Sequence, residues 1–154
     1  MPTVKSIPDG YNSVTPYVII DNGRASEALD FYRRAFNAKE IMRMPRPEGG
    51  IMHSEIRLGD SVVMVADESP KMQAFRPKHY GGSPISLHVY VANVDETTKQ
   101  AEAAGATVIR PVAEQFYGDR TSGLQDPFGL RWHLATHVRD VSPQEMEQHM
   151  HATA

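Results

Sequence analysis

One arrangement of elements occurs twice in this chain, and the repeat restricts the fold more than any other feature. The segments TPYVIIDNGRASEALDFYRRAFNAKEIMRM and ISLHVYVANVDETTKQAEAAGATVIRPV each show a β-rich run, a short amphipathic helix and a second strand. The expected strands cover residues 17–20 and 40–44 in the first half, and residues 87–91 and 107–110 in the second. The small and apolar residues of the helical faces are Ala28, Phe31 or Tyr32, and Ala35, then Val94, Thr98, Ala101 and Ala104.

The residues around the two helices support the same division. Asn37 and Gly105 follow the helices, and Asn and Gly take the left-handed conformation after a helix most readily. At the other ends, Ser26 is expected to cap the first helix, and Asn93 with Glu96 resembles a capping box for the second.

Each half then closes with a hairpin. In the first half, residues 53–58 and 61–66 flank the two-residue turn Gly59-Asp60, which is a favourable hairpin signal. In the second half, the turn DPFG at residues 126–129 leads into a strand over residues 130–136, and Phe128 is expected to pack below it. The pattern predicts tandem βαβββ modules, each of about 60 residues.

These modules predict an α+β fold. Neither module can close a core alone, so the two are expected to combine. Two four-stranded sheets can curve into a cup-shaped mixed β-sheet with the helices outside and a pocket inside. We expect one domain over residues 11–146, with modules at about 14–70 and 84–138 and a linker at about 71–84. Residues 147–154 are expected to form a C-terminal tail with a frayed end.

Composition limits the function more loosely. The chain has 154 residues, 40% hydrophobic and 23% charged, which is typical of a soluble globular domain. A net charge of −3 argues against a nucleic-acid surface, and no run approaches the ~18 apolar residues of a membrane span. The absence of cysteine excludes disulfides and thiolate chemistry. We expect a cytoplasmic protein without nucleic-acid or membrane partners.

Five segments together resemble the vicinal oxygen chelate superfamily, which contains glyoxalase I, extradiol dioxygenases, fosfomycin-resistance enzymes and bleomycin-binding proteins. They are YNSVTPYVIIDNGRASEALDFYRRAF, MHSEIRLGDSVVMVADE, SLHVYVANVDETTKQAEAAGATVIRPV, FYGDRTSGLQDPFG and WHLATH. The chain is most similar to the PhnB-like glyoxalase/bleomycin-resistance branch. This resemblance implies the glyoxalase/bleomycin-resistance fold, a small-molecule ligand and a homodimer.

Strand alternation sorts the side chains into a helix face and a concave face. Four of the five histidines between residues 53 and 137 fall on the expected concave face, which favours a polar pocket; the alternative is solvated or hydrogen-bonded histidines. The expected concave residues are Thr15, Tyr17, Ile19, His53, Glu55, Arg57, Ser61, Val63, Val65, Asp67, Ser86, His88, Tyr90, Arg131, His133, Ala135 and His137.

The resemblance also implies a metal site with one ligand from each of four strands, usually His or Gln and Glu. Its four positions fall on Val14 or Thr15, on Val63, on Ser86 and on His133, of which only His133 is a ligand type. A shift of two residues keeps the strand face and brings in His88, and Glu55 could contribute a third ligand. The expected metal ligands are therefore His88 and His133, for one divalent ion such as Zn, Ni, Fe or Mn.

The segment QFYGDRTSG leaves two readings open. Tyr117 could stack on a planar ligand and Arg120 could bind a carboxylate or phosphate. Alternatively, Gly118 makes a bend, Asp119 caps a turn and Arg120 pairs with an acid elsewhere. The residues expected to bind substrate are Tyr17, His53, Tyr90, Tyr117, Arg120 and Arg131.

Two functions follow from the resemblance. The first is a metal-dependent lyase, isomerase or transferase of the glyoxalase type, acting on a small oxygenated substrate with Glu55 as the proton-shuttling carboxylate. The second is a metal-free protein that sequesters a small compound, as in antibiotic resistance. A dimer with an idle pocket is a third reading.

Overall fold

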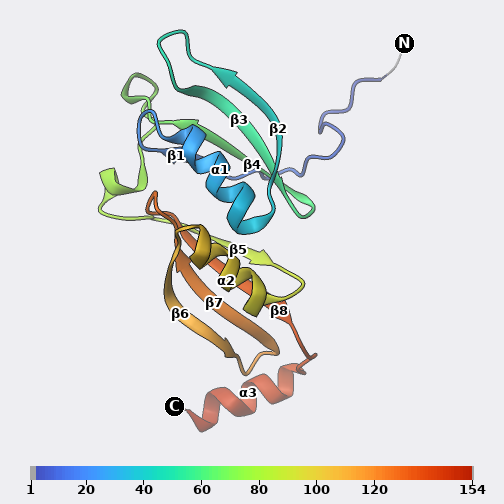
Figure 1. The fold of residues 1–154 in the computed structure, drawn as a ribbon. Helices are drawn as coiled ribbons and strands as arrows, with labels where there is room; N and C mark the ends of the chain where they lie inside the picture. Colours follow the sequence, from blue (N-terminus) through green and yellow to red (C-terminus); the bar gives the residue numbers. More distant parts are fainter. Residues whose placement is uncertain (1–2, 154) are drawn as a thin grey trace. The chain divides into compact units, whose positions relative to one another are not determined.

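The computed structural model describes residues 3–153, and its contacts divide the chain into two compact units. The first unit ends at Gly82 and the second begins at Ser83, within the segment expected to be the linker. Each unit contains one four-stranded mixed sheet with a helix against it (Figure 1). The α+β prediction of tandem βαβββ modules with helices outside the sheets is confirmed.

In the first unit, the sheet order is β1-β4-β3-β2, with β1 parallel to β4 and the other pairs antiparallel. The helix α1 packs on this sheet through buried residues such as Leu29, Phe31 and Tyr32. Two short 3-10 helices, η1 and η2, follow the sheet. The bounds are β1 Tyr17–Ile20, α1 Ala25–Phe36, β2 Lys39–Pro45, β3 Ile51–Leu58, β4 Ser61–Asp67, η1 Pro70–Met72 and η2 Pro77–Tyr80.

The second unit repeats this topology with the order β5-β8-β7-β6, where β5 is parallel to β8. The helix α2 contacts β6, β7 and β8, and the largest core side chain is Trp132 on β8, which is 1% exposed. The bounds are β5 Ser86–Tyr90, α2 Val94–Ala104, β6 Thr107–Glu114, β7 Asp119–Gln125, β8 Arg131–His137 and α3 Pro143–Ala152.

The start of α1 differs from the expectation. Ser26 is not the N-cap: the helix begins at Ala25, and Arg24 precedes it without a side-chain cap. Asp67, at the end of β4, supplies the missing acceptor, because its carboxylate accepts hydrogen bonds from the backbone N–H of Ala25 at 2.9 Å and of Ile51 at 2.6 Å. A carboxylate at a helix N-terminus is also favoured by the helix dipole. A distant residue therefore replaces a local cap.

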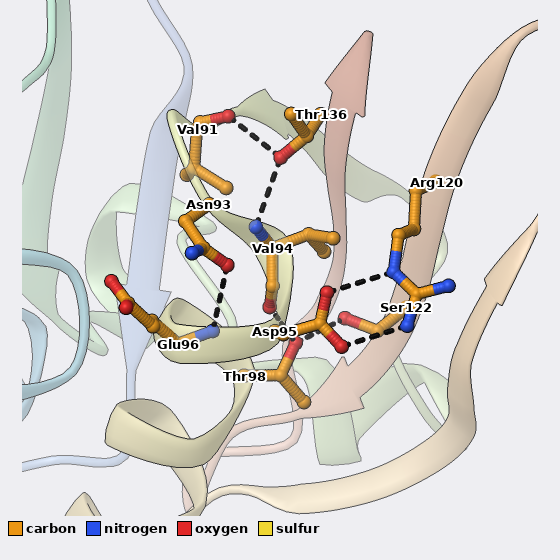
Figure 2. A network of polar contacts seen from close by, with 9 residues as sticks. All are labelled: Val91, Asn93, Val94, Asp95, Glu96, Thr98, Arg120, Ser122 and Thr136. Atoms are coloured by element: carbon orange, nitrogen blue, oxygen red, sulfur yellow. Dashed lines mark hydrogen bonds and ion pairs between the residues drawn. The ribbon is translucent and has the colours of Figure 1, made fainter. Parts of the chain in front are cut away.

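At the start of α2, Asn93 is the N-cap as predicted. The Asn93 side chain accepts a hydrogen bond from the backbone N–H of Glu96 (Figure 2). Thr136, at the end of β8, also accepts from the backbone N–H of Val94 through its hydroxyl, at 2.9 Å. Asp67 and Thr136 thus occupy the same place in the two units, where the last strand holds the first turn of the helix.

Two further contacts attach α2 to β7 (Figure 2). Thr98 and Ser122 form a hydroxyl–hydroxyl hydrogen bond of 2.7 Å, and both residues are buried. Arg120 forms a two-pronged ion pair with Asp95, with nitrogen–oxygen distances of 2.7 and 2.8 Å. The helix is therefore fixed to its sheet by polar pairs as well as by apolar packing.

The DPFG turn is a tight connection between β7 and β8, as expected. The Asp126 carboxylate accepts hydrogen bonds from the backbone N–H groups of Phe128 and Leu130 and from the indole N–H of Trp132, each at 2.9 Å. Phe128 is buried below the turn, and Gly129 takes a left-handed φ of 89°. The turn is thus tied to the core of the second unit.

The expected face of β4 was wrong. Glu55 pairs with Met64 and Tyr17 also pairs with Met64, so Met64 lies on the face of Glu55. Ser61, Val63, Val65 and Asp67 alternate with it and lie on the opposite face, towards α1. The sequence SVVMVAD is apolar on both sides, so its alternation does not indicate a face.

Of the expected tail at residues 147–154, residues 147–152 lie in α3, and Ala154 lies outside the described residues. The helix begins with a capping box, in which Ser142 and Glu145 bond each other's backbone N–H groups. Its His149 ring stacks on Phe116 at the turn between β6 and β7, with ring centroids 4.3 Å apart. This contact places α3 beside that end of the second sheet (Figure 1).

Candidate functional site

The first unit gathers a chain of polar side chains on the face of its sheet opposite α1. The hydroxyl of Tyr17 meets Nδ1 of His53 at 2.7 Å, and Nε2 of His53 meets a carboxylate oxygen of Glu55 at 3.0 Å. The second carboxylate oxygen of Glu55 accepts a hydrogen bond from the hydroxyl of Tyr11. Three of the residues expected in the site, Tyr17, His53 and Glu55, therefore lie in contact. We call Tyr11, Tyr17, His53 and Glu55 together the Tyr–His–Glu chain.

The hydrogen bonds of this chain indicate which atoms donate and which accept. An ionised carboxylate can only accept, so Nε2 of His53 carries the proton and Nδ1 accepts from Tyr17. The bonds from Tyr11 and then from His53 lower the pKa of Glu55, against its burial. Burial and then the nearby charge of Glu55 raise the pKa of Tyr17. These shifts favour the carboxylate form of Glu55 and the phenol form of Tyr17.

The second unit has a hollow on the equivalent face of its own sheet. A row of paired residues crosses all four strands there: His88 on β5, His133 on β8, Gly123 on β7 and Arg110 on β6. Gly123 carries no side chain, so the floor of the sheet is open at its position. The cavity is about 290 Å³ and is lined by Ser83, Pro84, Ile85, Ser86, Ile109, Arg110, Gly123, Leu124, Arg131, Trp132 and His133.

The two expected metal ligands lie side by side. His88 and His133 are directly paired on parallel strands, and their rings are stacked with centroids 6.4 Å apart. Burial first, then the charges of Arg110 and other cationic neighbours, lower the pKa of His133, which favours the neutral imidazole that binds metals. Within residues 3–153, however, no group of three or more His, Asp or Glu side chains is placed to hold a metal ion.

Two imidazoles supply half of a four-coordinate site, so the pair is incomplete by itself. Glu55 belongs to the first unit and both histidines belong to the second. The three-residue site therefore stays a prediction, and we derive no chemical step through a metal.

Tyr90 and His137 meet at a buried carboxylate. Asp119 accepts hydrogen bonds from the Tyr90 hydroxyl at 2.9 Å and from Nδ1 of His137 at 2.7 Å, and Nε2 of His137 contacts Asp140 at 2.9 Å. Burial alone raises the pKa of Asp119, but the bonds from His137 and Tyr90 outweigh it and the net change is downward. Tyr90, expected to bind substrate, thus has its hydroxyl engaged within the protein.

The remaining expected substrate ligands differ in their surroundings. Arg131 lines the hollow of the second unit. Tyr117 lies at the turn before β7, edge-on to Phe116. The guanidinium of Arg120 is held by Asp95 of α2, which matches the alternative in which Arg120 pairs with an acid elsewhere. Its neighbour Asp119 points to the opposite face, as expected for adjacent residues on a strand.

Sequence reasoning missed Tyr11, Arg110 and the role of Asp119. Tyr11 precedes the first strand, and no local pattern links it to Glu55, 44 positions away. Arg110 lies on an edge strand whose pairing with β7 is irregular on both sides of it. Alternation alone therefore does not settle its face.

The order of elements, the paired four-stranded sheets and the polar sheet faces define a tandem βαβββ protein. The profile of the Glyoxalase/Bleomycin resistance protein/Dioxygenase superfamily matches residues 16–134, and the chain belongs to this superfamily. An uncharacterised protein of Mycobacterium bovis is 36% identical over 141 residues, covering 90% of this chain and 91% of that protein.

Solved structures show the same fold. TioX from Micromonospora sp. ML1 is 26% identical with a TM-score of 0.62, covering 82% of this chain and all of that one. A PhnB protein from Bacillus cereus is 20% identical with a TM-score of 0.62, covering 81% and 99%. A superfamily enzyme from Burkholderia phytofirmans PsJN is 22% identical with a TM-score of 0.61, covering 79% and 97%.

Among the described residues, none of the helices has the length and apolar character needed to span a membrane.

Proposed function

We propose that this protein is a glyoxalase-type isomerase or lyase that moves a proton on a small oxygenated substrate through Tyr17 and His53. The observation that carries the proposal is the continuous hydrogen-bonded chain from Tyr17 through His53 to Glu55. An imidazole oriented by a buried carboxylate on one nitrogen and facing a hydroxyl on the other is an arrangement suited to proton transfer.

The proposed step conserves every proton. The Tyr17 oxygen takes a proton from the substrate while its own proton passes to Nδ1 of His53. Glu55, 8% exposed, stabilises the resulting imidazolium through the existing bond to Nε2. Reversal of the relay returns the proton to a different atom of the substrate, so the protein is unchanged and the substrate is isomerised.

Glu55 takes a different part in this step from the shuttling role expected of it. Both of its oxygens accept hydrogen bonds, one from Tyr11 and one from His53. It therefore orients and stabilises His53, which moves the proton. Tyr17 is the exposed end of the chain, with 47% of its surface accessible, so it is the group that a ligand can reach.

Proton exchange with solvent tests this proposal without knowledge of the product. The protein is incubated in D₂O with a panel of 2-oxo acids, α-hydroxyketones and 2-hydroxythioesters, and loss of the α-proton signal is followed by NMR. We expect catalysed exchange on at least one member, and a fall of about 100-fold in His53→Gln and Tyr17→Phe. Tyr80→Phe, an exposed tyrosine of the same unit, is the matched control.

The same experiment can reject the proposal. Exchange at the uncatalysed rate across the panel, or equal exchange in wild type and both variants, would remove the relay from the function. Thermal unfolding of each variant separates loss of the relay from loss of the fold.

A metal-dependent form of the activity is the second candidate, supported by the pairing of His88 and His133 on one sheet face. Elemental analysis of protein purified without added metal tests it, alongside His88→Ala and His133→Ala. Near-stoichiometric Zn, Ni, Fe or Mn that is lost in both variants supports this form, and absence of metal after incubation with all four ions opposes it.

The homodimer, the cytoplasmic location and the PhnB-like branch belong to the same proposal. The superfamily supports the dimer, and the fold of the Bacillus cereus PhnB protein supports the branch. Sedimentation velocity over a range of concentrations tests the dimer, which a single monomer boundary at all concentrations would exclude.

A further inference from the structure

The ionisable side chains that line the hollow of the second unit are all basic. Its lining contains Arg110, Arg131 and His133, and no aspartate or glutamate. This is unusual in a chain with a net charge of −3. Because Arg131 is paired with Ser86 and lies two residues from His133 on the same strand face, the cationic groups surround one opening.

Both arginine side chains are free of partners among the described residues. Within residues 3–153, the guanidinium groups of Arg110 and Arg131 form no hydrogen bond or ion pair. Arg120, one strand away on the opposite face, is held by a two-pronged pair with Asp95.

Gly123 sets the position of one arginine. A Cβ at Gly123 would lie 3.2, 3.4 and 3.5 Å from Cβ, Cγ and Cδ of Arg110. The arginine stem therefore lies along the open strand position and carries its guanidinium over the sheet. Because Gly123 has no Cβ, it leaves the space that the Arg110 stem needs in order to reach over the hollow.

The first unit differs at the matching position. Ser54 and Ser122 are both fully buried, and each is followed by the residue that faces the ligand side, Glu55 in the first unit and Gly123 in the second. One repeat therefore carries a carboxylate where the other has an open floor between cations. The two units therefore carry different charged groups at matching positions of their sheets.

We propose that the hollow of the second unit binds the carboxylate or phosphate group of a small organic anion, with Arg110 and Arg131 as its two clamps. Planar guanidinium groups bind such oxyanions through paired hydrogen bonds. The volume of about 290 Å³ fits a small ligand, and Ile85 and Ile109 offer its body an apolar wall. This site is independent of the proton relay of the first unit.

Binding measurements test the site without turnover. Inorganic phosphate, benzoate and phenyl phosphate are titrated against the full chain by isothermal calorimetry at low salt, with neutral benzamide as the uncharged comparison. We expect saturable binding of at least one anion and none of benzamide. Which anion binds identifies the group as carboxylate or phosphate.

Two variants and one matched control assign the binding to the arginines. Arg110→Gln and Arg131→Gln are each expected to weaken binding about tenfold. Lys99→Gln removes the same charge from the exposed surface of α2, on the other face of the sheet, and is expected to bind as wild type does.

Several results would overturn the proposal. They are no saturable binding of any anion, unchanged affinity in both arginine variants, or an equal loss in Lys99→Gln, which would indicate unspecific attraction by net charge. Far-UV circular dichroism and melting temperature confirm that each variant is folded. Because no catalysis is measured, failure of the proton-transfer proposal leaves this outcome unaffected.

Discussion

The buried hydroxyl pair between α2 and β7 offers a quantitative test of how the second unit is held together. Thr98 donates to the carbonyl of Val94 at 2.6 Å, so its single proton is committed there (Figure 2). Ser122 must then donate to Thr98 across the 2.7 Å contact. Thr98 and Ser122 are 6% and 2% exposed, so water cannot readily replace either partner.

The direction of these two hydrogen bonds predicts that the two single substitutions cost different amounts of unfolding free energy. Thr98→Val keeps the side-chain shape but leaves the Ser122 hydroxyl buried without an acceptor, which costs about 1–3 kcal/mol of unfolding free energy. Ser122→Ala leaves Thr98 still bonded to Val94, so the expected cost is about 0.5–1.5 kcal/mol. In the double variant no orphaned donor remains, and the loss should fall short of the sum by about 1 kcal/mol.

Urea unfolding followed by tryptophan fluorescence measures all four proteins, since Trp132 is the one tryptophan of the chain and is buried in this unit. Ser54→Ala in the first unit is the control: its hydroxyl donates to the Val65 carbonyl, and its effect should add to that of Thr98→Val. Strict additivity of Thr98→Val and Ser122→Ala would refute the hydrogen-bonded pair. A larger cost for Ser122→Ala than for Thr98→Val would refute the assigned direction.

Two further predictions concern contacts made at the end of β8 and just after it. Gly118 has φ +100°, and a Cβ there would lie 2.1 Å from the carbonyl oxygen of Arg139, so Gly118→Ala should cost about 2–4 kcal/mol. Gly59→Ala, with positive φ but open space, should cost only about 1 kcal/mol in the same urea assay. Bonds to Asp140 and then Asp119 raise the pKa of His137, so its stabilising effect is complete below the unfolded pKa and is lost as pH rises through the folded value. Wild type should therefore lose more stability than His137→Asn between about pH 6 and pH 8, and parallel curves would contradict this.

The fold was largely predictable because its signals are local. The repeated order of elements, Asn93 before α2 and the turns at Gly59 and at Asp126 each depend on a few neighbouring residues. Ser26 was the wrong N-cap because the acceptor came from Asp67, on a strand 42 positions later. No pattern around the helix start indicates such a partner.

The face of β4 shows where alternation stops being informative. Both sides of SVVMVAD are apolar, so the pattern alone could not separate Val63 from Met64. The pairing of Leu58 with Ser61 across the two-residue turn determines which face each β4 residue occupies, because paired residues share a face. Following the register through the hairpin would have placed Met64 beside Glu55.

By itself, the sequence determined the kind and order of the elements of the two βαβββ modules and the superfamily, since these depend on local periodicity and turn chemistry. It also placed Tyr17, His53 and Glu55 on one face of the sheet. Only the tertiary structure decided the partners: Tyr11 with Glu55, Arg120 with Asp95, and Arg110 over Gly123. Each of these contacts joins elements distant in the chain, and strand register and helix docking, which bring such elements together, are set by the packing of the whole unit.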